Sequence, residues 1–177
     1  ARIDDGLLGP PETVSWAIQW HYPIVLERDW NWWFDARVGG GLLGALGSHQ
    51  VDLVRWLLGS EFVAVGGTLH NFLSERPDAV TRELKPVTTD NHCALSGELA
   101  NGARGSIVLD ATARAVSQRD GWTLSFHGRD SSLCLDGEAR LWALRGKEKT
   151  EETQPLDQVD GLPEGMFPGG FLYFARE

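Results

Sequence analysis

The sequence is poor in the features that mark several large classes of protein. Only two cysteines, Cys93 and Cys134, occur among the 177 residues. Neither belongs to a CxxC or a Cys/His spacing, so neither a disulfide framework nor a metal site is expected. We expect both to be reduced core thiols of a cytoplasmic protein. No apolar run approaches the roughly 20 residues that span a bilayer, and residues 1–9 lack the apolar segment of a signal peptide.

Basic residues are also scarce. Lysine and arginine number 16 against 25 aspartates and glutamates, which gives a formal net charge of −9. Nucleic acids and anionic membranes bind basic surfaces, so we expect neither as a partner. Hydrophobic residues make up 42% of the chain, and 21 glycines provide turns. Such a chain is long enough to bury the core of one domain.

Alternating apolar and polar residues predict a chain that is mainly β-structure. The Asn101-Gly102 pair is typical of a hairpin turn. Residues 42–58 are apolar around nearly the whole helical circumference, which predicts a buried helix that ends at Gly59. The predicted strands cover residues 11–22, 62–72, 91–99, 103–113, 122–127, 132–135 and 139–144; residues 74–88 form a polar connection, and residues 147–154 are an edge strand or a loop.

A strand, a helix and then about six strands predict an α+β fold, in which a large, predominantly antiparallel sheet carries its helices on one face. The other face would stay apolar unless a second subunit covered it. We therefore expect that face to be used for oligomerisation, as a homodimer or a higher homo-oligomer. Periodic segments reach both ends, at residues 1–8 and 171–177, so residues 1–177 are expected to be one domain of a longer protein.

Residues 39–44 match the GxGxxG pattern of dinucleotide-binding loops. That pattern requires a buried strand in front of it, whereas residues 30–37 are polar and aromatic. We interpret the glycines as a flexible lead into the helix, with Gly44 and Gly47 allowing close packing. No cofactor-binding residue is assigned in this chain.

Two polar residues, His49 and Asp52, interrupt the apolar helix, and Ala45 lies one turn before His49. A buried polar pair has to be hydrogen-bonded or functional. His49 is therefore either a satisfied core histidine or a catalytic acid and base. Asp52 is a candidate substrate-binding residue, with an ion pair to Arg55 as the alternative.

An aromatic loop, Trp-Asn-Trp-Trp-Phe at residues 30–34, precedes the glycines. It either packs over the edge of the core or forms a wall for a sugar ring, because aromatic faces suit the apolar faces of pyranoses. Trp30 and Trp32 are the candidate substrate-binding residues of this loop. His21, at the end of the first predicted strand, opens toward it and is a further candidate.

The segment GGGLLGALGSHQVDLVRWLLG, residues 39–59, resembles the C-terminal domain of the glucose-fructose oxidoreductase/inositol dehydrogenase/MocA family. The family pattern is a glycine triplet, then Asp-x-Gly-x-His-x-x-Asp and an apolar helix that ends in glycine. The fitting positions are Gly39, Gly40, Gly41, Gly47, His49, Asp52 and Gly59. Residues 4–9, 89–91, 101–105 and 127–133 are similar to further family segments, so the resemblance covers nearly the whole chain.

The resemblance implies the substrate-binding and oligomerisation domain of an NAD(P)-dependent oxidoreductase that acts on a sugar, polyol or related alcohol by hydride transfer. NAD or NADP would be bound mainly by an N-terminal Rossmann domain that these residues lack, so this fragment alone should be inactive. His49 maps onto the family's catalytic histidine, but Ala45 stands where the family has an aspartate. The alternative is a non-catalytic sugar-binding, regulatory or dimerisation domain with a decayed active site.

Overall fold

The computed structural model describes residues 8–117, 120–137, 140–146 and 148–151. Its strands are β1 (Pro11–Gln19), β2 (Phe62–His70), β3 (Glu75–Pro77), β4 (Leu84–Pro86), β5 (His92–Leu99), β6 (Arg104–Asp110), β7 (Trp122–Gly128), β8 (Ser132–Asp136), β9 (Leu141–Arg145) and β10 (Glu148–Glu151). Its helical segments are α1 (Pro23–Leu26), the 3-10 turns η1 (Trp32–Phe34) and η2 (Ala36–Val38), the π-helical turn η3 (Leu43–Gly47) and α2 (Ser48–Leu58).

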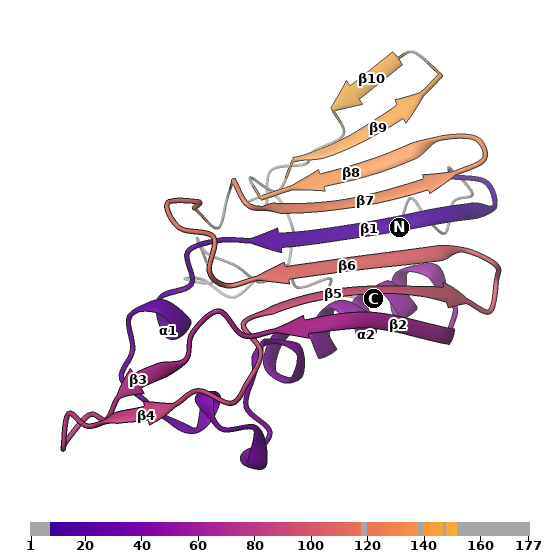
Figure 1. Ribbon diagram of the computed structural model, residues 1–177. Helices are drawn as coiled ribbons and strands as arrows, with labels where there is room; N and C mark the ends of the chain where they lie inside the picture. The colour runs from indigo at the N-terminus through magenta and orange to yellow at the C-terminus, as the bar shows by residue number, and fades with distance from the viewer. Residues whose placement is uncertain (1–7, 118–119, 138–139, 147, 152–177) are drawn as a thin grey trace, which may run out of the picture.

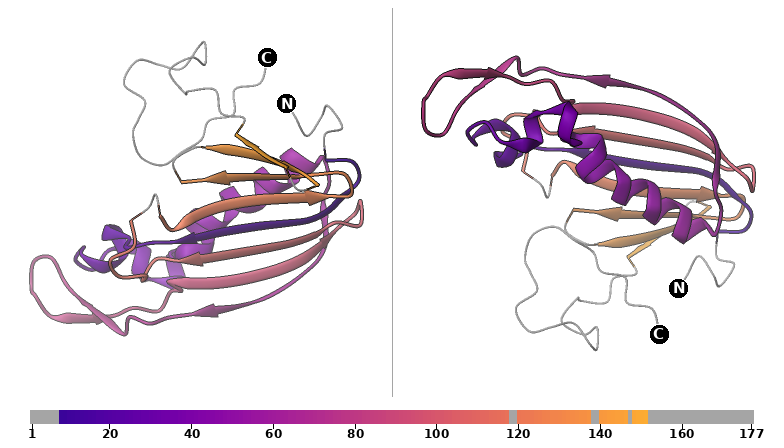
Figure 2. Two further views of the ribbon diagram at one scale, coloured as in Figure 1. Left: turned by 90° about the horizontal axis from the view of Figure 1, so that it is seen from above. Right: turned by 90° about the horizontal axis from the view of Figure 1, so that it is seen from below.

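Eight of these strands form one sheet in the order β10-β9-β8-β7-β1-β6-β5-β2, and β3 pairs with β4 in a separate hairpin (Figure 1). Strand β1 lies inside the sheet, parallel to β6 and antiparallel to β7. The other neighbouring strands of the large sheet pair antiparallel. Helix α2 crosses one face, and none of the described helices lies on the opposite face (Figure 2). The predicted α+β fold is confirmed.

The core lies between the sheet and the η3–α2 segment. Side chains alternate between the two faces of a strand, and on β1 the buried set is Val14, Trp16 and Ile18. Trp16 lies opposite Ile107 of β6 and Leu124 of β7. The same register repeats across the sheet, so one face of it carries nearly all the large apolar side chains.

The opposite face, called the open face below, differs from the sequence prediction. Ser15 of β1 lies opposite both Ser106 and Ser125, and Ser106 lies opposite Ser96. The expectation of an apolar surface is therefore wrong at the centre of this face. The buried apolar residues of β1 share the other alternation, and the only apolar residues beside the serines on β1, β5 and β6 are Ala17, Ala94 and Val108.

The predicted helix at residues 42–58 is present, but it begins with the π-turn η3 before α2 continues as an α-helix. A Cβ at Gly47 would lie 2.6 Å from Leu43 Cδ1 and 3.4 Å from Leu109 Cδ1, so the helix packs closely at this glycine. The expectation that the helix is buried all round is wrong, since a single helix on a sheet buries only one side. The predicted end at Gly59 is confirmed, with a left-handed φ of 55°.

The predicted polar connection at residues 74–88 contains the β3–β4 hairpin. Its turn is held by Asp78, which bonds the Lys85 ammonium at 2.5 Å and accepts from the Val80 and Thr81 amides. These contacts hold the pKa of Asp78 well below its usual range. Of the two readings of residues 147–154, an edge strand is confirmed at β10. The expectations for residues 1–7 and 171–177 lie outside the described residues.

The two cysteines occupy opposite faces of the sheet, and both are free thiols. Cys93 is fully buried in the core, as predicted, and burial raises the pKa of its thiol to about 11. Cys134 is only half-buried, because its register with Ser125 puts it on the open face. Among the described residues, no helix is both long and apolar enough to cross a membrane.

We predict that a disulfide-exchange reagent at pH 8 modifies Cys134 readily and Cys93 only after unfolding. The thiolate is the reacting species, and the Cys93 thiol is buried and almost entirely protonated at that pH. Absorbance of the released thiol, followed with and without urea, measures the two rates. The C134S variant is the control, and rapid labelling of this variant in the folded state would contradict the assignment.

Candidate functional site

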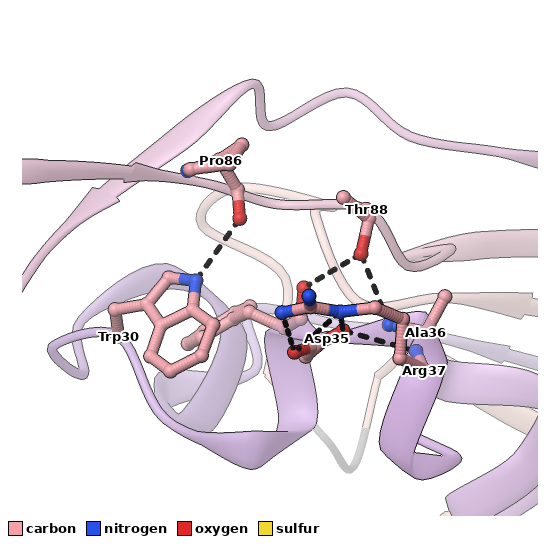
Figure 3. Close-up of polar contacts among 7 residues, drawn as sticks. Trp30, Asp35, Ala36, Arg37, Pro86 and Thr88 are labelled. Carbon is pink, nitrogen blue, oxygen red and sulfur yellow. Dashed lines mark hydrogen bonds and ion pairs between the residues drawn. The ribbon is translucent and has the colours of Figure 1, made fainter.

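The segment 88–91, between β4 and β5, fastens the aromatic loop to the sheet. The Thr88 hydroxyl accepts a hydrogen bond from the Ala36 amide at 3.0 Å (Figure 3). The Thr89 hydroxyl donates to the Trp33 carbonyl at 3.1 Å, and the Thr89 side chain is buried. Buried polar groups that are bonded in this way fix one arrangement of the backbone. The loop before the helix is therefore tied to the start of β5.

Asp90 extends this connection to the helix itself. Its carboxylate accepts a hydrogen bond from the Leu43 amide at 2.8 Å, and its carbonyl accepts from the Leu42 amide at 3.1 Å. A negative charge at the start of a helix interacts favourably with the exposed amides and the helix dipole. The same charge would repel a phosphate, and it already uses one of those amides. Residues 39–44 therefore do not fit the pyrophosphate of a dinucleotide.

The glycines before η3 are needed for close packing. A Cβ at Gly40 would lie 2.3 Å from the Trp33 carbonyl oxygen. Gly41 has a φ of 109°, and a Cβ there would lie 2.3 Å from an Asp90 carboxylate oxygen. The sequence analysis interpreted these glycines as a flexible segment before the helix. The structure shows instead that Gly40 and Gly41 are tightly packed.

Helix α2 presents a solvent-facing row formed by Ser48, His49, Asp52 and Trp56. His49 is exposed in the described structure, so the expectation of a buried histidine is wrong. Asp52 forms an ion pair with Arg55 at 3.3 Å, which confirms the alternative stated for that residue. Arg55 also binds Glu61 at 2.5 Å, just before β2.

The aromatic loop divides into packed and exposed rings. The indole of Trp30 donates to the Pro86 carbonyl at 3.0 Å (Figure 3). The Lys85 ammonium lies 4.8 Å from the centre of the Trp30 ring. Trp33 is buried, as packing over the core predicts, whereas Trp32 is 58% exposed. Trp33 thus fits the packing reading, and the reading of Trp32 as a wall for a sugar ring stays a prediction.

His21 lies just beyond β1, where its Nε2 is 2.7 Å from a Glu27 carboxylate oxygen. The neighbouring Tyr22 packs between Trp20 and Trp33, with ring centres 5.0 and 5.9 Å away. Burial raises the pKa of the Tyr22 phenol above its ordinary value. The structure thus engages His21 with Glu27, at the end of α1, and not with the row on α2.

Sequence reasoning did not find the structural contacts of two carboxylates, Asp35 and Asp90. Asp35 is buried, accepts from the Arg37 amide at the start of η2, and binds the Arg37 guanidinium at 2.7 Å (Figure 3). This guanidinium holds the pKa of Asp35 below its usual range. The Asp-x-Arg spacing of a helix cap was available in the sequence, whereas nothing local marks Asp90. Within the described ranges, no group of three His, Cys, Asp or Glu side chains could hold a metal ion.

Residues 1–134 match the sequence profile of the GFO/IDH/MocA C-terminal domain. An uncharacterized oxidoreductase of Synechocystis is 37% identical over 113 residues, covering 63% of this chain and 29% of that protein. Levoglucosan dehydrogenase of Pseudarthrobacter phenanthrenivorans is 32% identical over 123 residues, covering 62% of this chain and 31% of that enzyme. The chain therefore spans about 30% of the length of these two relatives.

A solved structure of levoglucosan dehydrogenase in complex with NADH and levoglucosan superposes with a TM-score of 0.70. Its sequence is 25% identical, and the match covers 85% of this chain and 42% of that one. The fold described above thus recurs in the matched 42% of that enzyme's chain.

We predict that Gly41→Ala destabilises the fold by about 2 kcal/mol or more, because alanine is strained at this φ and its methyl group would displace Asp90. The matched control is Gly44→Ala. A Cβ at Gly44 meets only the Gly39 carbonyl, at 3.4 Å, and alanine favours a helix. Urea denaturation gives both values, and equal stability of the two variants would contradict the packing described for Gly41.

Proposed function

Because the chain belongs to the GFO/IDH/MocA family, we propose that it is the substrate-binding domain of an NAD(P)-dependent oxidoreductase acting on a sugar, polyol or related alcohol. The observation that carries this proposal is the exposed His49 near the start of α2. An imidazole exchanges a proton near neutral pH, which suits removal or return of the proton on a substrate hydroxyl. A histidine serving only the core would be expected inside the helix–sheet interface.

In this proposal His49 holds or moves the hydroxyl proton, and Trp32 packs against the apolar face of the sugar ring. Asp52, kept in place by Arg55, accepts a hydrogen bond from a second hydroxyl. His21 and Trp30 stay predictions as substrate contacts. Their polar atoms are engaged with Glu27 and the Pro86 carbonyl, so contact would use their ring faces.

The nicotinamide cofactor, when bound, accepts or supplies the hydride. Asp90 makes residues 39–44 unsuitable for its phosphates, so we assign cofactor binding to a second domain in the longer protein. The levoglucosan dehydrogenase complex, of which this chain covers 42%, contains NADH and levoglucosan and supports this division. We propose the cytoplasm as the compartment, consistent with the two free thiols.

We predict that His49→Ala lowers kcat/KM by about 100-fold or more in the protein that carries this domain together with its nucleotide-binding domain. The measurement is NAD(P)H absorbance with a panel of sugars and polyols. His127→Ala is the matched control, because His127 lies on the open face and bonds Ser132. An unchanged kcat/KM in the His49 variant would remove this residue from the mechanism.

A second candidate is a non-catalytic sugar-binding or regulatory protein. Ala45 favours it, because a half-buried methyl group stands one turn before His49 where the family pattern has a carboxylate. Titration of the longer protein with NADH and with sugars separates the two candidates. Sugar binding without NADH binding or turnover would favour the second one.

We further propose that two copies pack through the open face. The serines at its centre leave a surface without large side chains, on which a second sheet can lie closely. We predict that Ser106→Arg reduces the molar mass measured by light scattering by half, because a guanidinium at the centre would hold the sheets apart. The control is Arg145→Ala at the end of β9. Equal masses for wild type and S106R would reject this interface.

A further inference from the structure

Strand β2 forms one edge of the eight-stranded sheet. It pairs with β5 along its length, and among the described residues the sheet order places no strand on its other side (Figure 1). Alternate backbone N–H and C=O groups of an edge strand point outward and lack sheet partners. The natural complement of such an edge is another extended strand.

Natural edge strands are usually blocked by charged residues, proline or a short length. Strand β2 reads FVAVGGTLH, which contains no lysine, arginine, aspartate, glutamate or proline over nine residues. Its side chains are also exposed, with Val63 at 63%, Val65 at 62% and Leu69 at 54%. One irregularity in register occurs at its start, between Phe62 and Ala64. The remaining seven residues form an edge that none of these features blocks.

The sequence of β2 is complementary to itself around Gly66. If two copies pair antiparallel about this residue, Val65 lies opposite Gly67 of the other copy, and Leu69 comes opposite the irregular start of β2 at Val63. Small residues oppose each other on the other face, where Ala64 meets Thr68 and Gly66 meets its own equivalent. A shift by one residue would join the α2 face of one copy to the open face of the other.

Charge also favours a second copy at this edge. Each chain carries a net charge of −9, so two copies repel over most of their surface. Strand β2 contains no acidic residue and so adds nothing to that repulsion. The nearby Glu61 is already paired with Arg55. A foreign acidic or basic strand would find no charge to recognise here.

We propose that β2 pairs antiparallel with β2 of a second copy about a two-fold axis at Gly66, which joins two sheets into one continuous sheet. Nine residues extend over about 30 Å, which gives an interface smaller than a standard stable one. The contact is therefore weak and depends on concentration. It is separate from the open face, so a chain that uses both surfaces forms a tetramer.

We predict that Val65→Lys weakens this association at least 10-fold in sedimentation velocity of the 177-residue chain across a concentration series. The two new ammonium groups would lie near each other across the axis and repel. Val80→Lys is the matched control, since it makes the same change at a valine that is 87% exposed on the β3–β4 hairpin. Circular dichroism verifies that both variants fold.

A cross-link tests the register directly. A Cβ added at Gly66 meets no atom within 4 Å, so Gly66→Cys is tolerated, and the two residues facing each other across an antiparallel pair are close enough for a disulfide. In a C134S background we expect oxidation to give a covalent dimer for G66C and none for V80C.

Three results would overturn the edge proposal: a wild-type chain that stays monomeric at millimolar concentration, equal association of V65K and V80K, or equal cross-linking of G66C and V80C. Loss of association in S106R with none in V65K would reject the edge alone and leave the open-face dimer standing. Loss of association in V65K with none in S106R would reject the open-face dimer and leave the edge pairing standing. The two interfaces are thereby tested independently.

Discussion

The hydrogen bond between the Leu43 amide and the Asp90 carboxylate joins the start of the helix to the sheet. Asp90 immediately precedes β5, and the Thr88 and Thr89 hydroxyls beside it hold the aromatic loop. One short segment thereby sets the direction of α2 and the depth of the loop together. The exposure of His49 and of the Trp32 ring follows from that arrangement, because each lies only a few residues from the fastened backbone.

Much of the fold follows from local patterns in the sequence. Alternation identified the strands of the large sheet, and Gly59 identified the end of the helix. Such patterns report which residues share a face, but they do not report what covers that face. The burial of His49 was therefore mispredicted, because half-exposed leucines such as Leu57 and Leu58 made the helix look apolar all round. The open face was wrongly predicted to be apolar, because the valines along these strands were given more weight than the serines.

The contacts that build the candidate site were beyond sequence reasoning. Asp90 bonds an amide 47 residues away, Trp30 bonds a carbonyl 56 residues away, and Thr89 does the same. A spacing rule detects partners within a helical turn or across a hairpin, where geometry fixes the distance. Asp35 with Arg37 is such a pair and was detectable. The close approach of the Trp33 carbonyl to Gly40 and of the Asp90 carboxylate to Gly41 left only a run of glycines in the sequence. That run equally matched a nucleotide-binding loop.

The position of β1 also constrains how the chain folds. This first strand lies between β6 and β7, so its two neighbours are synthesised more than 80 residues later. Until they emerge, Trp16 of β1 has no sheet to join, whereas the β5–β6 hairpin pairs two strands that are neighbours in the sequence. Long-range pairing of this kind slows folding and prolongs exposure of apolar surface. During synthesis, the strand that ends up inside the finished sheet thus waits longest for its neighbours.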